Sequence, residues 1–312
     1  MRCIALTLLA AVMISGCIAE QASFPSELEP TNYTIENITF NKTHALMFDN
    51  FRWNHMPVTI YMYTQNATDR DIEAFREGMK IWKDQTDGLV AFKEVDSPQV
   101  ADITVRWTKE VPVVGEEAVE LGTSMPKVID TGLFNLSVGC EVTIVTKTSF
   151  STSCPQLVAA HELGHALGLD HPNTTNPAVR YYDIMYPQLH CLQRVTPDIL
   201  DTLKELYRMQ PAPDLTFMNV TSTKRNVHLD IKMVVMNRGL LDSNATELQI
   251  KARSNVIGTF DLPVIEPGSQ LTITGKITVL SDITELELVI DPGRKNTDMY
   301  PNNNVMLLRT VW

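Results

Sequence analysis

The segment with the clearest chemical potential is residues 161–171, which read HELGHALGLDH. His161 and His165 lie four residues apart, so on a helix their imidazoles project from one face and can bind a single metal ion. Gly168 permits a sharp turn after the helix, and His171 can then fold back as a third nitrogen ligand. Three protein ligands leave one coordination position open for water, which is the arrangement of a catalytic zinc site.

Glu162 supplies the remaining group that such a site needs. It follows the first histidine on the adjacent side of the helix, where it can reach a metal-bound water without being a ligand. Zinc lowers the pKa of its water toward neutrality and polarises the scissile carbonyl, while Glu162 acts as general base. The motif therefore predicts hydrolysis of peptide bonds with one Zn²⁺ ion as cofactor. The alternative, a buried polar helix without metal, would have to hide three histidines and a glutamate.

A second segment supports the same chemistry. Residues 183–187 read DIMYP and follow His171 closely. Together with the extended histidine motif, this segment resembles the metzincin family of zinc proteases, and its Met-Tyr-Pro order resembles the matrixin branch. The resemblance covers residues 51–209. It implies that Met185 lies in a turn beneath the metal, as a support and not a ligand. For a protein or peptide substrate we expect an extended chain bound beside an edge strand, which is a common mode of peptide recognition.

The sequence also departs from the matrixin pattern. It contains no cysteine-switch propeptide, so latency through a thiolate is not expected. The remaining histidines of the mature chain do not match the set that matrixins use for a structural zinc, so we expect one metal ion. These histidines are His44, His55, His190 and His228.

Local patterns indicate the elements that must position the motif. A capping box at Thr68 and Asp71 begins a helix, in which Phe75 and Trp82 lie on one apolar face. The active-site helix is predicted from Pro155 to Leu167, and a last helix follows the cap at Thr196. With the family resemblance, this gives an α+β domain: a twisted mixed sheet, an active-site helix and a C-terminal helix. Strands are predicted at 57–63, 89–95, 101–107 and 141–146, whereas 108–138 has no clear pattern.

The cysteines fit an oxidising compartment. Cys3 belongs to an N-terminal leader, and Cys17 is a candidate lipid-attachment site, which leaves three others. We predict a disulfide between Cys154 and Cys191, because these two bracket the metal motif, with Cys140 as a free thiol. The alternative is that all three are buried thiols.

Residues 210–312 have a different pattern. Short alternating strands separated by turn signals predict an all-β, immunoglobulin-like sandwich. The segment resembles the cell-adhesion-related modules called CARDB, which implies a role in positioning or binding; the alternative is a generic sandwich that only stabilises the chain. The residues that carry the resemblance are Pro213-Asp214-Leu215, Asn237-Arg238-Gly239, Val264-Ile265-Glu266-Pro267-Gly268, Asp291-Pro292 and Asn302-Asn303-Asn304.

The N-terminus predicts export. Residues 4–14 form an apolar stretch of signal-peptide length, too short to span a bilayer, and the sequence at 14–17 resembles the lipobox of prokaryotic lipoproteins. We therefore interpret 1–17 as a signal peptide with lipobox, 18–50 as a polar spacer, and Cys17 as the lipid anchor. An ordinary signal peptide and a secreted product is the alternative. Export also fits eight glycosylation sequons, at Asn32, Asn37, Asn41, Asn66, Asn135, Asn173, Asn219 and Asn244.

The net charge of −11 argues against nucleic acid as a partner, since nucleic-acid binding needs a basic surface. The leading hypothesis is thus a zinc endopeptidase on the outer face of an archaeal or bacterial membrane. The alternatives are another zinc amidohydrolase and a non-catalytic surface binding or adhesion protein. Neither the oligomeric state nor the cleavage preference follows from the sequence.

Overall fold

The computed structural model describes residues 40–42, 44–45, 51–110, 113–114, 118–119, 121–146, 154–172, 181–278 and 283–309. The predicted signal peptide, the lipid site Cys17, most of the spacer and the sequon at Asn173 lie outside these residues. The chain divides into two compact units. The first contains residues 44–130 and 134–210, and the described part of the second contains 40–42, 131–133 and 211–309. Among the described residues, no helix is both long and apolar enough to cross a membrane.

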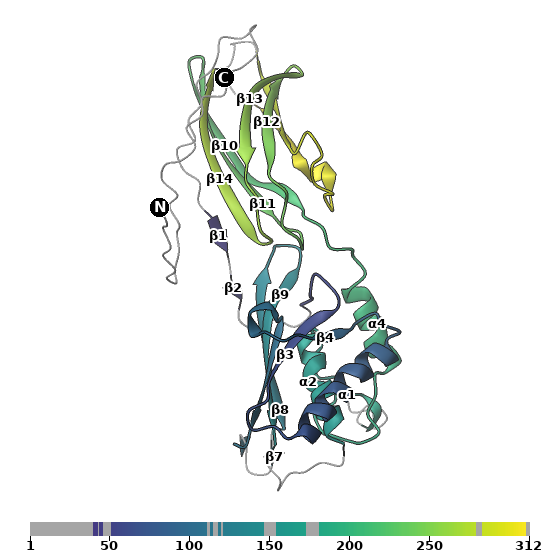
Figure 1. Cartoon of the computed structure of the whole chain (residues 1–312). Coiled ribbons are helices and arrows are strands. Elements are labelled where there is room, and N and C mark those ends of the chain that lie inside the picture. Colours follow the sequence, from purple (N-terminus) through teal and green to yellow (C-terminus); the bar gives the residue numbers. More distant parts are fainter. Residues whose placement is uncertain are drawn as a thin grey trace. The chain divides into compact units, whose positions relative to one another are not determined.

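The first unit is built on a mixed six-stranded sheet (Figure 1). Four neighbouring strands (β4, β3, β5 and β9) are parallel, β8 pairs antiparallel with β9, and the short β2 pairs antiparallel with one end of β8. A separate pair is formed by β6 (Val113–Val114) and β7 (Ala118–Val119). In spatial order the sheet contains β2 (His44–Ala45), β8 (Gly122–Asp130), β9 (Asn135–Val145), β5 (Ile103–Thr108), β3 (Val58–Tyr63) and β4 (Phe92–Glu94).

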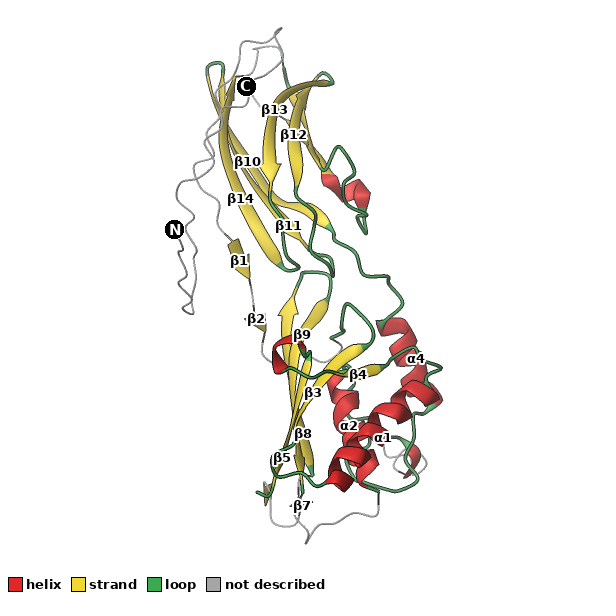
Figure 2. Cartoon of the chain, viewed as in Figure 1, coloured by secondary structure: helices red, strands yellow, loops and turns green. Residues whose placement is uncertain are grey.

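The helices α1 (Asp69–Gln85), α2 (Pro155–Ala166) and α4 (Pro197–Leu206) lie on one side of this sheet (Figure 2). The capping box predicted for α1 is confirmed: Thr68 and Asp71 each bond the other's backbone N–H. A 3-10 turn, η1 (Pro98–Val100), precedes β5. α2 is the inner helix, because eight of its twelve residues are buried. Packing therefore holds α2 on most sides, while His161 and His165 are half-buried.

The core of the first unit lies between the sheet and the helices. Strand β3 alternates buried and half-buried residues, so its inward side chains meet α1 and α2. The Trp82 indole N–H of α1 donates a 2.8 Å hydrogen bond to the Ala160 carbonyl of α2. The largest fully buried side chains here are Trp53, Trp82, Phe75, Ile60, Ile103, Leu163, Leu167, Ile184, Met185 and Leu203.

The structure differs from the sequence prediction mainly at the edge of the sheet. The strand predicted at 141–146 begins earlier, at Asn135, and β8 was not predicted at all. β8 reads GTSMPKVID and carries Gly, Ser, Pro and Lys in place of alternating apolar residues. An edge strand with one neighbour along most of its length needs less apolar patterning than an inner strand, which explains the weak signal.

The second unit is a sandwich of two four-stranded sheets in which every described pair is antiparallel. Strand β12 alternates strictly between buried and half-buried residues, as a sheet with one face on a core must. A 3-10 turn, η3 (Pro301–Asn304), leads into the last strand. One sheet has the order β1 (Phe40–Lys42), β14 (Ser269–Thr278), β11 (His228–Asn237), β10 (Leu215–Arg225); the other β13 (Asn255–Leu262), β12 (Thr246–Ala252), β15 (Glu285–Ile290), β16 (Val305–Arg309).

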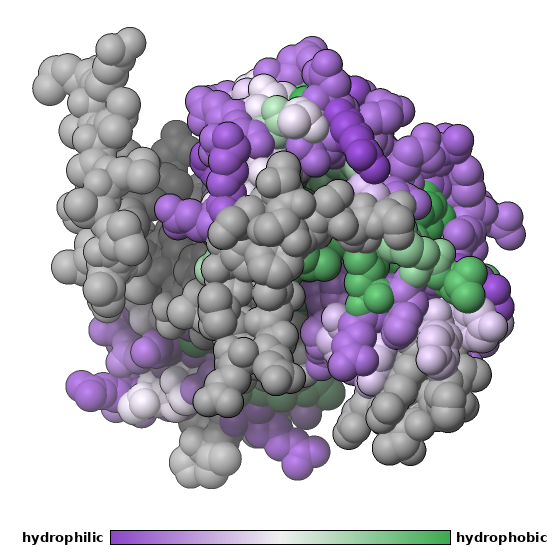
Figure 3. Space-filling model, turned by 90° about the horizontal axis from the view of Figure 1, so that it is seen from below, coloured by the Kyte–Doolittle hydropathy of each residue, from purple (hydrophilic) through white to green (hydrophobic). Residues whose placement is uncertain are grey.

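In the view of Figure 3, the surface of the described residues is mostly hydrophilic, with a smaller apolar area. The apolar side chains are instead gathered in two separate buried clusters, one in each unit. Each unit therefore has its own core, which is the physical criterion for a domain.

Buried Asn237 organises the loops at one end of the sandwich. Its side chain is fully buried and makes four hydrogen bonds to backbone groups, so both its amide hydrogens and its carbonyl oxygen are satisfied. The amide nitrogen donates to the carbonyls of Leu241 and Ile265, and the carbonyl oxygen accepts from the N–H groups of Asp214 and Gly239.

We predict that Asn237→Ala lowers the free energy of unfolding of this unit by about 2 kcal/mol or more, because it leaves buried backbone groups without partners. Urea unfolding of the full chain measures the change. Asn255→Ala, at an exposed position on β13, is the matched control and should leave the transition unmoved. Equal effects of the two substitutions would contradict the role assigned to Asn237.

Candidate metal centre

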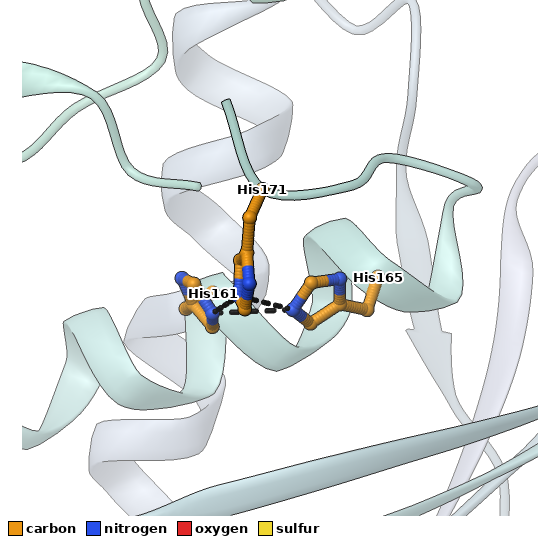
Figure 4. Close-up of side chains that lie close together, drawn as sticks. All are labelled: His161, His165 and His171. Atoms are coloured by element: carbon orange, nitrogen blue, oxygen red, sulfur yellow. Dashed lines mark hydrogen bonds between the residues drawn. The ribbon is translucent and has the colours of Figure 1, made fainter. Parts of the chain in front are cut away.

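Three histidine side chains converge at the surface of the active-site helix (Figure 4). His161 and His165 stand one turn apart on α2, and their Nε2 atoms are 3.2 Å apart. His171 reaches back from the segment after the helix and places its Nε2 at 3.1 Å from each of the other two. Two ligands at about 2.0 Å from a tetrahedral zinc are themselves about 3.3 Å apart. The three nitrogens therefore have the spacing that one such ion requires.

Backbone carbonyls hold two of these rings in the ligand tautomer. His161 Nδ1 lies 2.7 Å from the Ile184 carbonyl oxygen, and His165 Nδ1 lies 2.9 Å from the Leu169 carbonyl oxygen. A carbonyl can only accept, so each Nδ1 carries the proton and each Nε2 presents a lone pair. Two lone pairs at 3.2 Å repel each other, and a cation between them removes this repulsion. The donor set thus fits a metal ion bound through Nε2.

The local environment also keeps the imidazoles neutral. Burial, reinforced by the neighbouring His165 and His171, lowers the pKa of His161 from 6.5 to about 4. Burial is likewise the largest cause of a lowered pKa for His165 and for His171. Histidine binds metal in its neutral form, so at pH 7 these rings are ready to bind without first releasing a proton.

A tight turn after α2 reverses the chain direction, so that His171 lies beside the helix. Gly168 has φ = +98°, in the left-handed region that favours glycine, and a Cβ at this position would lie 1.9 Å from the Phe51 carbonyl oxygen. The last carbonyls of the helix are satisfied by the rest of the domain. The Trp53 indole donates to the Ala166 carbonyl at 2.7 Å, and the Tyr207 hydroxyl donates to the Leu167 carbonyl at 3.2 Å.

The segment containing Met185 packs beneath the helix. Met185 is buried, and a Cβ added at Gly164 would lie 2.2 Å from its sulfur, so the helix can approach this closely only because residue 164 is glycine. Asp183 fixes the turn by accepting from the Met185 N–H at 2.8 Å and from the Thr196 hydroxyl at 3.1 Å. Burial raises the pKa of Asp183. Met185 therefore packs directly against α2 at Gly164.

The carboxylate of Glu162 is buried against strand β8. The Ser124 hydroxyl lies 3.0 Å from Glu162 Oε2 and 2.7 Å from the Glu162 backbone carbonyl oxygen. At Gly122 an added Cβ would meet both Cγ and Oε1 of Glu162 at 2.7 Å. Sequence reasoning missed both β8 residues. They lie about forty positions from the histidine motif in a stretch without recognisable periodicity, so no local signal could have identified them.

A disulfide joins Cys154, immediately before α2, to Cys191 in the segment after Met185, with a Cα–Cα distance of 5.6 Å. Within that segment, Gln193 donates to the carbonyls of Tyr186 and Gln188, which orders the loop. Cys140 is a buried free thiol, and burial raises its pKa to about 12, so it stays protonated and unreactive.

The other described histidine side chains have different partners. His55 lies 3.3 Å from Asp102, and the His190 ring contacts Tyr181. Within the part of the chain that the structure describes, the set His161, His165 and His171 is the one group of three such side chains that could hold a metal. The structure thus brings together the three predicted ligand residues, and Glu162 follows the first of them on α2 with its carboxylate against β8.

Comparison with known proteins decides the family. Residues 51–208 match the model of the matrixin family, described as Matrixin, which is a little over half of the chain. The chain belongs to the matrixin family. Residues 212–307 match the CARDB model. The predicted resemblances and the predicted fold class, an α+β matrixin domain followed by an all-β CARDB sandwich, are confirmed.

The chain is 25% identical over 162 residues to karilysin of Tannerella forsythia, a match that covers 46% of this chain and 30% of karilysin. The chain therefore spans about a third of that relative. Two solved structures each cover 32% of the chain. One is a domain of a putative cell surface protein of Methanosarcina acetivorans. It has 19% sequence identity to this chain, 92% of its own length is covered, and the TM-score is 0.29. The other is the CARDB domain of a Pyrococcus furiosus protein in complex with di-metal ions. It has 17% sequence identity to this chain, 90% of its own length is covered, and the TM-score is 0.28.

We predict that Gly168→Ala weakens zinc binding about tenfold or more, because its Cβ would collide with the Phe51 carbonyl and shift the turn that leads to His171. Gly88→Ala is the matched control. Gly88 also has positive φ, at +75°, but nothing lies within 4 Å of its added Cβ, so this variant carries the backbone cost alone. Competition with a chromophoric chelator measures the zinc affinity, and equal affinities of the two variants would contradict the prediction.

The histidine pKa values also predict how the metal-free protein responds to pH. Between pH 6.5 and about 4 the unfolded chain binds more protons at His161 than the folded protein does, so the free energy of unfolding falls as the pH drops through this window. We expect His161→Asn to reduce that fall. Urea unfolding in chelator at several pH values measures it, with the exposed His228→Asn as control. A pH dependence identical to wild type for His161→Asn would contradict the prediction.

Proposed function

We propose that this protein is a zinc-dependent endopeptidase that works outside the cell. The observation that carries the proposal is the convergence of three neutral imidazole nitrogens, 3.1–3.2 Å apart, with the buried Glu162 directly after His161 in the same helix. Membership in the matrixin family, a family of metalloproteases, supports it. A site that served structure alone would need no general base beside three ligands.

Each residue of the centre has a separate task. His161, His165 and His171 would hold the zinc, which when bound polarises the scissile carbonyl and lowers the pKa of a coordinated water. The Nδ1 contacts to Ile184 and Leu169 keep two rings oriented. Glu162 accepts the proton of the attacking water on a carboxylate oxygen and delivers it to the nitrogen of the leaving amine.

The edge of the sheet offers a place for an extended substrate. Strand β8 pairs with β9 along its full length on one side. On its other side, the pairing among the described strands is limited to Val128 and Ile129, opposite β2. The backbone groups of 122–127 that face away from β9 can therefore bond a peptide lying antiparallel or parallel to the strand. Because Glu162 lies against Gly122 and Ser124, such a peptide would pass directly beside the base.

The N-terminal sequence supports activity outside the membrane. The signal peptide and lipobox of 1–17 would attach Cys17 to lipid at the outer face of an archaeal or bacterial membrane, and the spacer 18–50 would separate the enzyme from it. A secreted form is the other possibility, and sequons at exposed positions such as Asn66, Asn219 and Asn244 fit either. The CARDB unit would position the enzyme or bind a surface partner.

We predict that Glu162→Gln lowers the rate of peptide hydrolysis at least about a hundredfold with zinc retained, because the amide cannot accept the water proton. Casein digestion measures the rate, and elemental analysis measures zinc per chain. Glu141→Gln, at a half-exposed position on β9 paired with Lys127, is the matched control and should keep full activity.

Three outcomes would contradict the proposed function. Casein digestion that survives a strong chelator would exclude a metal-dependent reaction. Full activity of Glu162→Gln would exclude this residue as the base. Cleavage of small amides without cleavage of proteins would indicate another zinc amidohydrolase. Mass-spectrometric mapping of cuts in a peptide library distinguishes internal from terminal cleavage.

A further inference from the structure

We propose that Ser124 is a positioning residue for the general base: its hydroxyl, together with the space left by Gly122, fixes the carboxylate of Glu162 for proton transfer. This inference rests on the proposed function and extends it to a strand outside the metal motif. It assigns a second role to β8, which would both bind the substrate backbone and orient the base.

Ser124 contacts Glu162 twice. Its Oγ lies 3.0 Å from Oε2 of the carboxylate and 2.7 Å from the backbone carbonyl oxygen of the same residue. A hydroxyl has one hydrogen, so it shares that hydrogen or alternates between the two acceptors. Either way, one side chain on the sheet is tied to both the helix backbone and the reactive end of Glu162, and this restricts where the carboxylate can lie.

The alternation of the strand explains why these two residues face the helix. Successive side chains of a strand point to opposite faces, so positions 122, 124 and 126 share a face while 123, 125 and 127 share the other. Lys127 bonds the half-exposed Glu141, and Met125 is exposed, which identifies the second face as the one turned away from α2. The face of Gly122 and Ser124 is therefore the one that covers Glu162.

Gly122 leaves the room that the carboxylate occupies. An added Cβ would lie 2.7 Å from Cγ, 2.7 Å from Oε1 and 2.9 Å from Cδ of Glu162. Gly122 is not among the residues with positive φ, so alanine can adopt its backbone conformation. The group that would yield is the flexible end of Glu162, since the neighbouring atoms belong to that side chain. Gly122→Ala is thus a probe that moves the base while leaving the strand in place.

The burial of Glu162 strengthens the effect of the Ser124 hydroxyl on the position of its carboxylate. Glu162 is 5% exposed, so its carboxylate has lost most of its water and depends on protein donors. A free glutamate side chain can rotate about three bonds, and a general base must lie within hydrogen-bond distance of the proton that it accepts. A donor held on a sheet restricts that rotation before substrate binds, which is the arrangement expected for a preorganised site.

The test compares four variants of the full zinc-loaded chain. We expect Ser124→Ala to lower kcat about tenfold, with KM, zinc per chain and the unfolding midpoint close to wild type. Ser124→Thr keeps the hydroxyl and suits a strand, so it should restore most of kcat. Gly122→Ala should lower kcat about a hundredfold through displacement of the carboxylate. Gly139→Ala, whose Cβ meets nothing closer than 3.6 Å, is the glycine control on the adjacent strand.

Crystal structures of zinc-loaded wild type and Ser124→Ala give a readout independent of turnover: the carboxylate should be ordered on Ser124 in the first and displaced or disordered in the second. The inference is overturned if Ser124→Ala keeps wild-type kcat, if threonine fails to restore it, or if zinc content and stability fall in step with activity. Failure of the proposed function would look different: either wild type would not cut casein at all, or its activity would survive a chelator or the Glu162→Gln substitution.

Discussion

The structure of the first unit depends on one electrostatic constraint: three imidazole nitrogens with lone pairs are held 3.1–3.2 Å apart. Carbonyls of Ile184 and Leu169 hold the Nδ1 protons of His161 and His165, so these rings cannot relieve the repulsion by exchanging tautomers. Burial disfavours the other remedy, protonation, and a bound cation removes the repulsion most directly. The features around the motif serve to hold this otherwise unfavourable arrangement.

Helix α2 holds His161 and His165 in this arrangement because it is packed into the domain, and not because the isolated helix is stable. A helix of twelve residues is marginal in isolation, and in this one eight of the twelve residues are buried. The Trp82 indole contacts the carbonyl of its sixth residue, the Trp53 indole contacts the last, and Met185 packs beneath Gly164. The disulfide from Cys154 ties its first turn to the loop after Met185. Residues from both ends of the domain's sequence therefore fix the position of α2, which carries His161 and His165.

The difference between local patterns and contacts between distant residues explains what the sequence could and could not predict. The histidine spacing, the cap of α1 and the Met185 segment are local patterns, in which a few neighbouring residues fix the conformation. Ser124, Gly122 and Trp53 act on α2 from 38 to 113 residues away, and each is an ordinary residue in its own neighbourhood. Their roles follow from sheet pairing and close approach, which depend on register and packing that one sequence does not reveal.

The same contacts explain how the chain tolerates a costly site. A buried carboxylate, a left-handed turn at Gly168 and three histidines that resist protonation each reduce the stability of the metal-free domain. The apolar core between sheet and helices offsets these costs, and a metal bound to the folded protein adds further stability. The CARDB unit keeps a separate core and its own buried polar contacts around Asn237. Substitutions in that core can therefore change the stability of the CARDB unit without altering the core that holds the three histidines.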